Sequence, residues 1–401
     1  MTDGLGLGDA FGATLDRITG QGGERARLGM AALMWISHSE RALKADELCH
    51  ALAVEIGSSN LDADNVPSIG LLLACCQGLA AVEKEASTVR LIHFTVQEYL
   101  RARPELFGSV QSIMAETCLS YLNSNQVKAV SPNSYSNFRS TPFLEYSSVY
   151  WGIHAKRKLS DRAKLLALKL FGRYNNHISI KILLEEQALY GYWVDFNNTS
   201  LFTGLHCASF FGIVDIVARL LEVGGYDINQ EDCVGYTPLL WGARNGHDGV
   251  VEILLKRDDV DPDMPDELDR TPLYWAVRNG HERMVRMLLE LDAVNPNELD
   301  MFGQTALSCA ALNGHEGVVK MLLGRDDVDP DEPDGCGQTP LSCAAWNGHE
   351  GVVKMLFRRD GVNPNQPDTL GRTPLWHASK RGHAGVMALL QPVASATLST
   401  T

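Results

Sequence analysis

Residues 339–357 read TPLSCAAWNGHEGVVKMLF, and residues 305–323 read TALSCAALNGHEGVVKMLL. The same pattern recurs in less regular copies at a spacing of 34 residues, with a threonine opening each copy at positions 203, 237, 271, 305, 339 and 373. Self-similarity at a period in the thirties indicates stacked repeats that share one continuous core, and not a globular enzyme core. The sequence therefore predicts a mainly α-helical solenoid of six repeats.

Each repeat is predicted to contain two short antiparallel helices. In the third copy, Thr271 can cap the first helix, and Pro272 suits its first turn because a proline there loses no hydrogen bond. Gly280 suits the left-handed residue at which that helix ends. Apolar residues then recur with helical spacing and predict the second helix. A segment rich in turn formers, such as residues 258–263, closes the repeat.

The order Thr-Pro-Leu, Ala, Gly-His, Val-Val and Leu-Leu resembles the ankyrin repeat over residues 197–391. The period of 34 is one residue longer than the 33 usual in that family, and the extra residue is placed most simply in the closing turn. The histidine that follows Thr-Pro-Leu in the family survives only as His206, so packing is expected to replace some hydrogen bonds between repeats. The resemblance implies a protein-binding surface on the concave face of the stack.

By the same resemblance, the partner-binding positions are the turn residues before each threonine and the exposed face of the first helix. Aromatic, Met and Arg side chains among acidic flanks are typical of protein-binding surfaces. Trp346 is the most informative candidate, because a large apolar side chain at an exposed position has little structural reason to be there. The candidates are Val234, Tyr236, Arg244, Leu268, Arg270, Arg278, Met301, Gln304, Leu312, Cys336, Gln338, Trp346, Leu370, Arg372 and Lys380.

Residues 25–123 are predicted to form a small winged-helix-like domain. The expected order is three helices, two strands and a further helix that opens with the capping-box pattern of Thr95 and Glu98. The third helix would be the recognition helix of a DNA-binding domain, but it contains no Lys or Arg, so DNA binding is the least favoured interpretation. The predicted elements cover residues 26–37, 45–55, 66–77, 79–83, 88–94 and 95–100.

Parts of this segment, including residues 27–36 and 91–100 (LIHFTVQEYL), look like the winged-helix segment after the NACHT nucleotidase of fungal NOD-like receptor proteins. Those proteins commonly end in ankyrin repeats. The sequence contains no Gly-x-x-x-x-Gly-Lys-Ser/Thr phosphate loop, so the nucleotidase is expected to be missing from this chain. Residues 1–24 are interpreted as a remnant of that upstream module or as disordered.

Residues 124–196 are predicted to be a helical linker and N-terminal cap of the repeats, because exposed solenoid ends need a cover. Within it, Tyr146, Tyr150 and His154 fall on one helix face. That face is either an aromatic docking surface or, as we favour, a packed interior face. Residues 392–401 are predicted to be a disordered tail.

Composition limits the partners and the compartment. From Thr203 onward the chain has 29 acidic and 16 basic residues, which argues against nucleic acid as a partner. No apolar run is long enough for a membrane span, and no signal pattern opens the chain. Nine cysteines without framework spacing predict reduced thiols. Together these features predict a cytoplasmic protein and leave a nuclear location open.

No catalytic, cofactor-binding or metal-binding residue is predicted, and no small-molecule substrate is inferred. Helices in adjacent repeats lie about 8–10 Å apart, whereas metal–nitrogen bonds are near 2 Å, so histidines of neighbouring repeats cannot share a metal. The same spacing argues against a disulfide between Cys309 and Cys343. The histidines of the Gly-His pairs, predicted to be structural, are His247, His281, His315, His349 and His383.

The function expected from these features is a non-enzymatic scaffold or sensor that binds a protein partner on the concave face of the repeats. The resemblance implies a role in intracellular signalling or in innate recognition of the NOD-like-receptor type. The alternative is that the chain is the C-terminal part of a nucleotide-dependent NACHT switch whose NTPase is missing from it.

Overall fold

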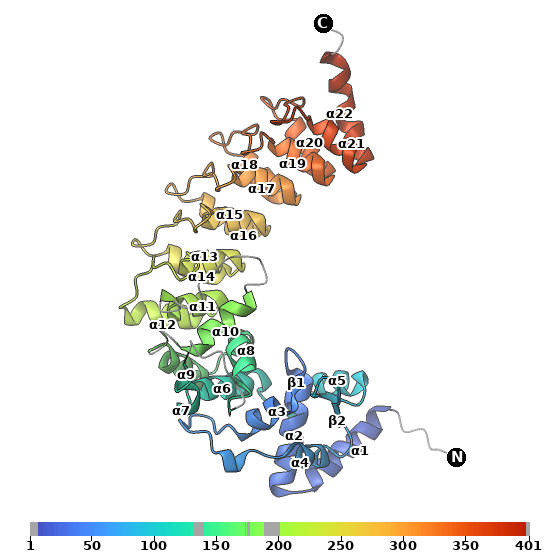
Figure 1. Ribbon diagram of the computed structural model, residues 1–401, viewed down its shortest axis with the longest axis vertical. Helices are drawn as coiled ribbons and strands as arrows, with labels where there is room; N and C mark the ends of the chain where they lie inside the picture. Colours follow the sequence, from blue (N-terminus) through green and yellow to red (C-terminus); the bar gives the residue numbers. More distant parts are fainter. Residues whose placement is uncertain (1–6, 132–139, 173, 175–176, 188–200, 398–401) are drawn as a thin grey trace, which may run out of the picture. The chain divides into compact units, whose positions relative to one another are not determined.

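Helices make up most of the structure, a computed structural model that describes residues 7–131, 140–172, 174, 177–187 and 201–397. The chain divides into two units, Met1–Gly204 and Leu205–Thr401. The first contains a small sheet among helices, and the second contains stacked helix pairs (Figure 1). The predicted fold class is therefore confirmed.

The first unit opens with helices around a three-stranded antiparallel sheet of order β1-β3-β2. Leu43 pairs with Val89, which adds the strand β1 that the sequence did not predict. A strand of two residues is too short to show alternating hydrophobicity. The elements are α1 (Leu7–Gly20), α2 (Gly23–His38), β1 (Leu43–Lys44), α3 (Ala45–Ala53), η1 (Ala63–Asn65), α4 (Ile69–Cys75), β2 (Ala80–Glu83), β3 (Thr88–Leu91), α5 (Phe94–Arg101) and η2 (Pro104–Leu106).

Two details at the ends of these elements correct the predictions. Helix α1 packs on α2 and buries Leu15 and Ile18, so of the two interpretations of residues 1–24, a remnant of an upstream module or a disordered segment, disorder does not describe α1. Helix α5 begins before Thr95, and its cap is His93, whose Nδ1 accepts the backbone N–H of Thr95 at 3.2 Å. An imidazole nitrogen therefore replaces the predicted threonine cap.

The rest of the first unit is helical, and its segments pack together. Because α6 contacts both α8 and α9, the ranges predicted as a domain (25–123) and a linker (124–196) form one unit. Residues 132–139, most of the predicted polar loop, lie outside the described residues. The helices are α6 (Val110–Leu122), α7 (Asn125–Lys128), α8 (Leu144–Arg157), α9 (Asp161–Phe171) and α10 (Ile178–Gln187).

The aromatic face of α8 is an interior face. Tyr146 and His154 are buried, and the Tyr146 hydroxyl lies 3.0 Å from His154 Nε2. His154 Nδ1 bonds to Gln111 Oε1 at 2.7 Å, which ties α8 to α6. Burial lowers the pKa of His154 to about 3, so the imidazole is neutral at pH 7. The packed interpretation is therefore confirmed for these two residues, and they do not form a docking surface.

The second unit consists of six helix pairs, as the period predicts, and successive pairs lie side by side (Figure 1). We call α13, α15, α17, α19 and α21 the first-helix row. The pairs are α11 (Gly204–Phe211) with α12 (Val214–Val223), α13 (Pro238–Arg244) with α14 (Asp248–Leu255), α15 (Pro272–Arg278) with α16 (Glu282–Leu289), α17 (Ala306–Asn313) with α18 (Glu316–Leu323), α19 (Pro340–Asn347) with α20 (Glu350–Phe357), and α21 (Pro374–Arg381) with α22 (Ala384–Thr397).

The predicted caps are present in the row. Thr271 Oγ1 accepts the backbone N–H of Tyr274 at 3.2 Å, and the threonines of repeats 2, 4, 5 and 6 do the same. Gly348 has φ of 76°, and the corresponding glycines of the other repeats are also left-handed. A Cβ on Gly348 would lie 2.5 Å from His383 Nδ1. Glycine is therefore required there both for the backbone and for the ring of the next repeat.

The histidines of the Gly-His pairs form a column, with one histidine in each repeat from the second onward, and this histidine column links successive repeats. His349 Nε2 donates to the carbonyl oxygen of Leu312 at 3.0 Å, and His383 Nε2 donates to that of Trp346 at 3.0 Å. His247 and His315 make the same bond to the preceding repeat. The hydrogen bonding expected to be lost with the other histidine position is thus supplied partly by this column.

The end of the described chain differs from the sequence-based expectation. Helix α22 continues to Thr397, so the tail predicted over 392–401 is helical as far as that residue. The alanines in this segment favour helix. Residues 398–401 lie outside the described part of the chain. No helix in the described ranges is both long and apolar enough to cross a bilayer.

Candidate partner-binding surface

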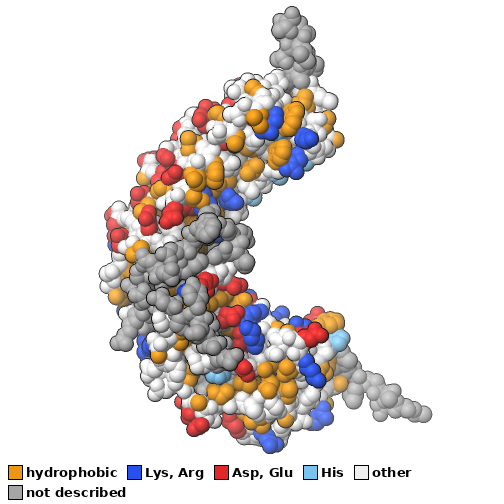
Figure 2. All heavy atoms as spheres, in the orientation of Figure 1, with side chains coloured by type: hydrophobic (Ala, Val, Ile, Leu, Met, Phe, Trp, Pro, Cys, Tyr) orange, Lys and Arg blue, Asp and Glu red, His pale blue; other side chains and the backbone are white. Residues whose placement is uncertain are grey.

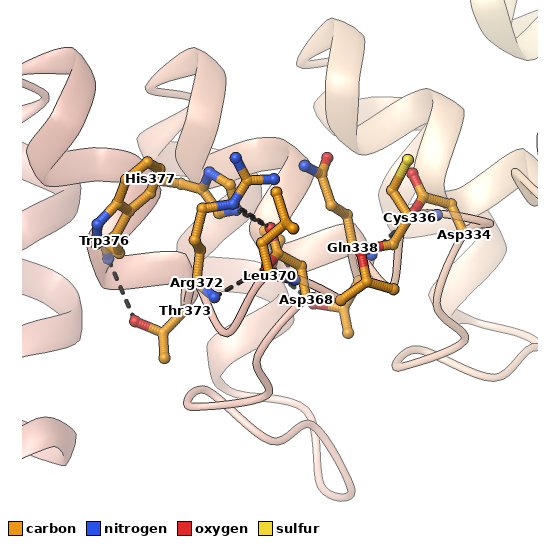
Figure 3. Close-up of polar contacts among 12 residues, drawn as sticks. Asp334, Cys336, Gln338, Asp368, Leu370, Arg372, Thr373, Trp376 and His377 are labelled. Carbon is orange, nitrogen blue, oxygen red and sulfur yellow. Dashed lines mark hydrogen bonds and ion pairs between the residues drawn. The ribbon is translucent and has the colours of Figure 1, made fainter.

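A five-residue turn precedes each helix of the first-helix row, and an aspartate organises it. In the last repeat, Asp368 Oδ1 accepts the backbone N–H groups of Leu370 and Arg372, both at 2.9 Å (Figure 3). The same pair of bonds forms in the other four repeats. We call these segments the finger turns; they cover residues 232–236, 266–270, 300–304, 334–338 and 368–372.

Neighbouring finger turns are joined by backbone hydrogen bonds. The N–H of Met301 donates to the carbonyl oxygen of Leu268 at 3.0 Å. The next two connections run from Gly335 to Phe302 at 2.9 Å and from Thr369 to Cys336 at 3.0 Å. The last four finger turns are therefore held in one row, which fixes the positions of their tips before any partner binds.

The second carboxylate oxygen of the aspartate is occupied in repeats 2, 3 and 6. Trp241 Nε1 donates to Asp232 Oδ2 at 2.7 Å, and Trp275 Nε1 donates to Asp266 Oδ2 at 3.1 Å. Burial raises the pKa of Asp232 to about 6 despite these bonds. In repeat 6 a histidine, His377, takes the place of tryptophan and lies 3.2 Å from Asp368 Oδ2.

An arginine closes the same turn in two of these repeats. Arg270 is buried and pairs with Asp266, with 2.7 Å between Nη2 and Oδ2. Arg372 Nε lies 2.7 Å from Asp368 Oδ2, the same oxygen that His377 approaches (Figure 3). The Arg270 guanidinium also lies over the ring of Trp275, 4.4 Å from its centroid. These turns are therefore closed by charged and aromatic groups together.

Repeats 4 and 5 lack both closing groups. Cys309 and Cys343 stand where repeats 2, 3 and 6 have Trp or His, and Gln304 and Gln338 stand where repeats 3 and 6 have Arg. Asp300 Oδ2 is buried and has no hydrogen-bond partner among the described residues. Burial raises the pKa of Cys309 to about 11 and that of Cys343 to about 12, so both are protonated thiols at pH 7 and poor nucleophiles.

Two of the predicted contact residues are buried. Tyr236 and Arg270 are only 4% and 5% exposed. Arg270 is held by Asp266, and the Tyr236 ring packs against Trp241, with Arg244 above it. The expectation that these two side chains face a partner is therefore wrong, because the bulky tryptophans of repeats 2 and 3 draw them into the interior.

The other candidates reach the surface to different degrees. Their backbone positions follow the finger turns and the C-terminal ends of the first-helix row, as the repeat pattern indicates. The exposed ones are Arg278, Met301, Cys336, Leu370 and Lys380, and the half-buried ones are Val234, Arg244, Leu268, Gln304, Leu312, Gln338, Trp346 and Arg372.

Trp346 has a structural role that the sequence did not reveal. Its ring makes an edge-to-face contact with His377 at 5.3 Å between centroids. The Arg381 guanidinium covers it at 4.0 Å from the centroid. The premise that this tryptophan is exposed without structural reason is therefore wrong, because it packs against the next repeat while part of it stays accessible.

Two exposed aromatic residues were missed. Phe302 is 62% exposed and occupies the tip position that Leu268, Cys336 and Leu370 occupy in their own finger turns. The 34-residue register points to Phe302, whereas the prediction named its neighbour Met301. Trp376 is 41% exposed, and no sequence signal separates it from the buried Tyr274 at the equivalent position of repeat 3.

Comparison with known proteins agrees with this geometry. The family described as ankyrin repeats (3 copies) matches residues 168–266, 205–300, 258–334, 291–368 and 326–398, which together span more than half of the chain. The chain belongs to the ankyrin-repeat family. The ankyrin matches begin at residue 168, earlier than the predicted start at 197.

A second family matches the first unit. The winged helix domain of GPI inositol-deacylase matches residues 16–112, which confirms a winged-helix domain and places its start within α1. The resemblance of this segment to NACHT-containing receptors stays a prediction.

Among solved structures, an ankyrin repeat domain from Acinetobacter baumannii is 27% identical in sequence, with a TM-score of 0.43. The match covers 47% of this chain and 97% of that one. No curated protein matches the chain.

Proposed function

We propose that this ankyrin-repeat protein is a non-enzymatic scaffold that binds a protein partner on the surface formed by the finger turns and the first-helix row. The observation that carries the proposal is the set of large apolar side chains exposed there. Met301, Phe302, Leu370 and Trp376 are 54%, 62%, 71% and 41% exposed. Exposed apolar groups gathered on one surface are typical of protein-binding sites.

The backbone beneath these side chains supports the same proposal. Each finger turn is braced by its aspartate, and the last four are bonded to one another. A surface that is ordered before binding loses less conformational entropy when a partner docks. Because the finger turns are already ordered, little conformational entropy of their backbone is lost when a partner binds their tip residues.

The test uses the full chain and an unbiased library of displayed protein fragments. Hydrogen exchange of a selected complex should show protection in the finger turns and the first-helix row. Phe302→Ala and Trp376→Ala should each weaken the selected fragment about tenfold or more, as truncation of a central aromatic residue usually does.

The control is Val223→Ala, because Val223 is 65% exposed and belongs to α12, a second helix, and not to the finger turns or the first-helix row. Its effect on affinity should be below about twofold, as for a residue outside the interface. Protection confined to the second helices, or an equal loss in the Val223 variant, would contradict the proposal.

The finer proposal is a role in intracellular signalling or NOD-like-receptor-type recognition. It is supported by the winged-helix match at residues 16–112 followed by ankyrin repeats, together with the resemblance of residues 91–100. Its alternative form makes the chain the C-terminal part of a nucleotide-dependent switch. A phosphate loop encoded upstream of Met1 in the same reading frame would support the switch, and a stop codon directly upstream would refute it.

A further inference from the structure

The first-helix row has a charge opposite to that of the unit it belongs to. From Thr203 onward the chain carries 29 acidic and 16 basic residues. The five helices of the row contain no Asp or Glu, and their charged residues are Arg244, Arg278, Lys380 and Arg381. The acidic side chains gather on the loop side of the repeats instead (Figure 2).

These four cations have no salt-bridge partner among the described residues, although the charge of Arg244 acts on the buried carboxylate of Asp232 and Arg278 donates a hydrogen bond to the Tyr274 hydroxyl. Cations elsewhere in the unit, such as Arg257 and Arg325, pair with a nearby aspartate. Arg244 lies over the ring of Trp275 at 4.9 Å, and Arg381 lies over that of Trp346 at 4.0 Å. The aromatic rings hold the guanidinium groups in place and leave their hydrogen-bonding edges open to a carboxylate.

The cations stand at the two ends of the row and not in its middle. At the equivalent position of successive repeats the residues are Arg244, Arg278, Leu312, Trp346 and Lys380. The central repeats therefore replace a cation with an apolar side chain. The finger turn of repeat 4, one of these central repeats, adds the exposed side chains of Met301 and Phe302.

We propose that the first-helix row binds a partner segment whose apolar centre is flanked by acidic residues on both sides. This proposal rests on the proposed function and specifies the partner's chemistry. Arg278 and Lys380 are three repeats apart, which corresponds to about 24–30 Å at the usual helix spacing. An extended segment of about eight or nine residues covers that distance.

The test measures binding of defined fluorescent peptides of about nine residues to the full chain. The first peptide has Glu at both ends and Leu, Trp and Leu in the centre. In the second, Lys replaces Glu; in the third, Ser replaces the apolar centre. The first should bind at least about tenfold more tightly than either of the others, and its affinity should fall with added salt.

Variants of the chain locate the binding site. Arg278→Glu and Lys380→Glu should each weaken the first peptide about tenfold, because each places a carboxylate against the acidic end of the peptide. The matched control is Arg359→Glu, an exposed arginine outside the first-helix row with the same change in charge. The control should change the affinity by less than about twofold, because a rim charge outside the contact acts only at long range.

The outcomes separate this proposal from the scaffold function. Tighter binding of the Lys peptide, or equal loss in the Arg359 variant, overturns the acidic partner. If an unbiased fragment library selects basic or neutral binders that protect the first-helix row from hydrogen exchange, the scaffold stands and the acidic partner is refuted. If no selected binder protects that row, both proposals fail.

Discussion

Repeats 5 and 6 share one backbone turn and differ in how it is closed. In both, the aspartate Oδ1 accepts two backbone N–H groups, at Asp334 and at Asp368 (Figure 3). In repeat 6 the second oxygen receives Arg372 and His377, whereas repeat 5 has Gln338 at the position of that arginine. Repeats 3 and 4 differ in the same way.

This difference shows that the two oxygens of the aspartate have different roles: the fold requires Oδ1, whereas the contacts of Oδ2 vary from repeat to repeat. Oδ1 shapes the turn, so aspartate recurs in every finger turn from the second repeat onward. Oδ2 takes no part in shaping the turn and is free to be closed by Trp and Arg or left open beside Cys and Gln. Closed repeats gain buried contacts at Oδ2, whereas exposed apolar tips occur in both kinds of repeat, at Phe302 in the open repeat 4 and at Leu370 in the closed repeat 6.

The largest expected effect is the difference in stability between two aspartate variants that lose Oδ2, one in a closed repeat and one in an open repeat. Asp266→Asn should destabilise the protein by about 3–5 kcal/mol, because it leaves the buried Arg270 without its counter-ion. Asp300→Asn should stay within about 1 kcal/mol of wild type, because Oδ2 of Asp300 has no partner to lose. Urea unfolding measures both; equal losses would erase the distinction between the two kinds of repeat.

A second pair of variants tests the contact between repeats. Gly348 and Gly382 both have φ of 76°, so alanine should cost about 1–2 kcal/mol at either. Only at Gly348 would the new Cβ meet the histidine of a following repeat, at 2.5 Å; at Gly382 nothing lies within 4 Å. Gly348→Ala should therefore cost about 1–3 kcal/mol more. If the two variants have unfolding free energies that agree within error, the histidine of the following repeat can move away from the new Cβ at no measurable cost.

The comparison extends to repeat 1, where His206 stands at the position of Leu240 in repeat 2. Burial lowers the pKa of His206 to about 4, from 6.5. The unfolded chain then binds a proton more readily, so this contribution is complete above about pH 6.5 and is lost as the pH falls toward 4.

At pH 5 the wild type should therefore lose about 2 kcal/mol relative to pH 7 that His206→Leu does not lose. Urea unfolding of both proteins at the two pH values gives the difference. Other titrating groups are common to both proteins and cancel. Parallel pH profiles would mean that His206 is protonated equally in both states.

The smallest effect comes from closing an open repeat. Gln304→Arg places a guanidinium where Arg270 and Arg372 pair with their aspartates, so it should stabilise the protein by about 0.5–1 kcal/mol through Asp300. Gln304→Lys should gain less, because an ammonium lacks the forked geometry. A thermal melt of the three proteins decides; a lower melting temperature for the arginine variant would show that Asp300 Oδ2 cannot be reached.

Much of the architecture could be predicted from the chain because its signals are local. The period of 34, the threonine caps and the left-handed glycines each depend on a few adjacent residues, and each occurs in the structure. The order of helices and strands in the winged-helix domain was also predicted from the sequence. The short strand β1 was not, since its partner Val89 is far along the chain and two residues carry no pattern.

The candidate surface was only partly predictable. The repeat register found the finger turns, but exposure at one position varies from the buried Arg270 to the half-buried Gln304. That difference depends on whether Trp275 or Cys309 stands at the equivalent helix position of the same repeat. The exposure of the Trp346 and Trp376 side chains likewise depends on residues that are close in space and not in sequence.

The sequence by itself determined the repeat, its two helices, the acidic balance of the second unit and the winged-helix order of the first. These follow from residue type and spacing, which act through the local backbone. Only the tertiary structure decided which side chains close the finger turns and which remain at the surface. That outcome depends on packing between residues brought together by the stack, where a ring, a guanidinium and a carboxylate compete for the same space.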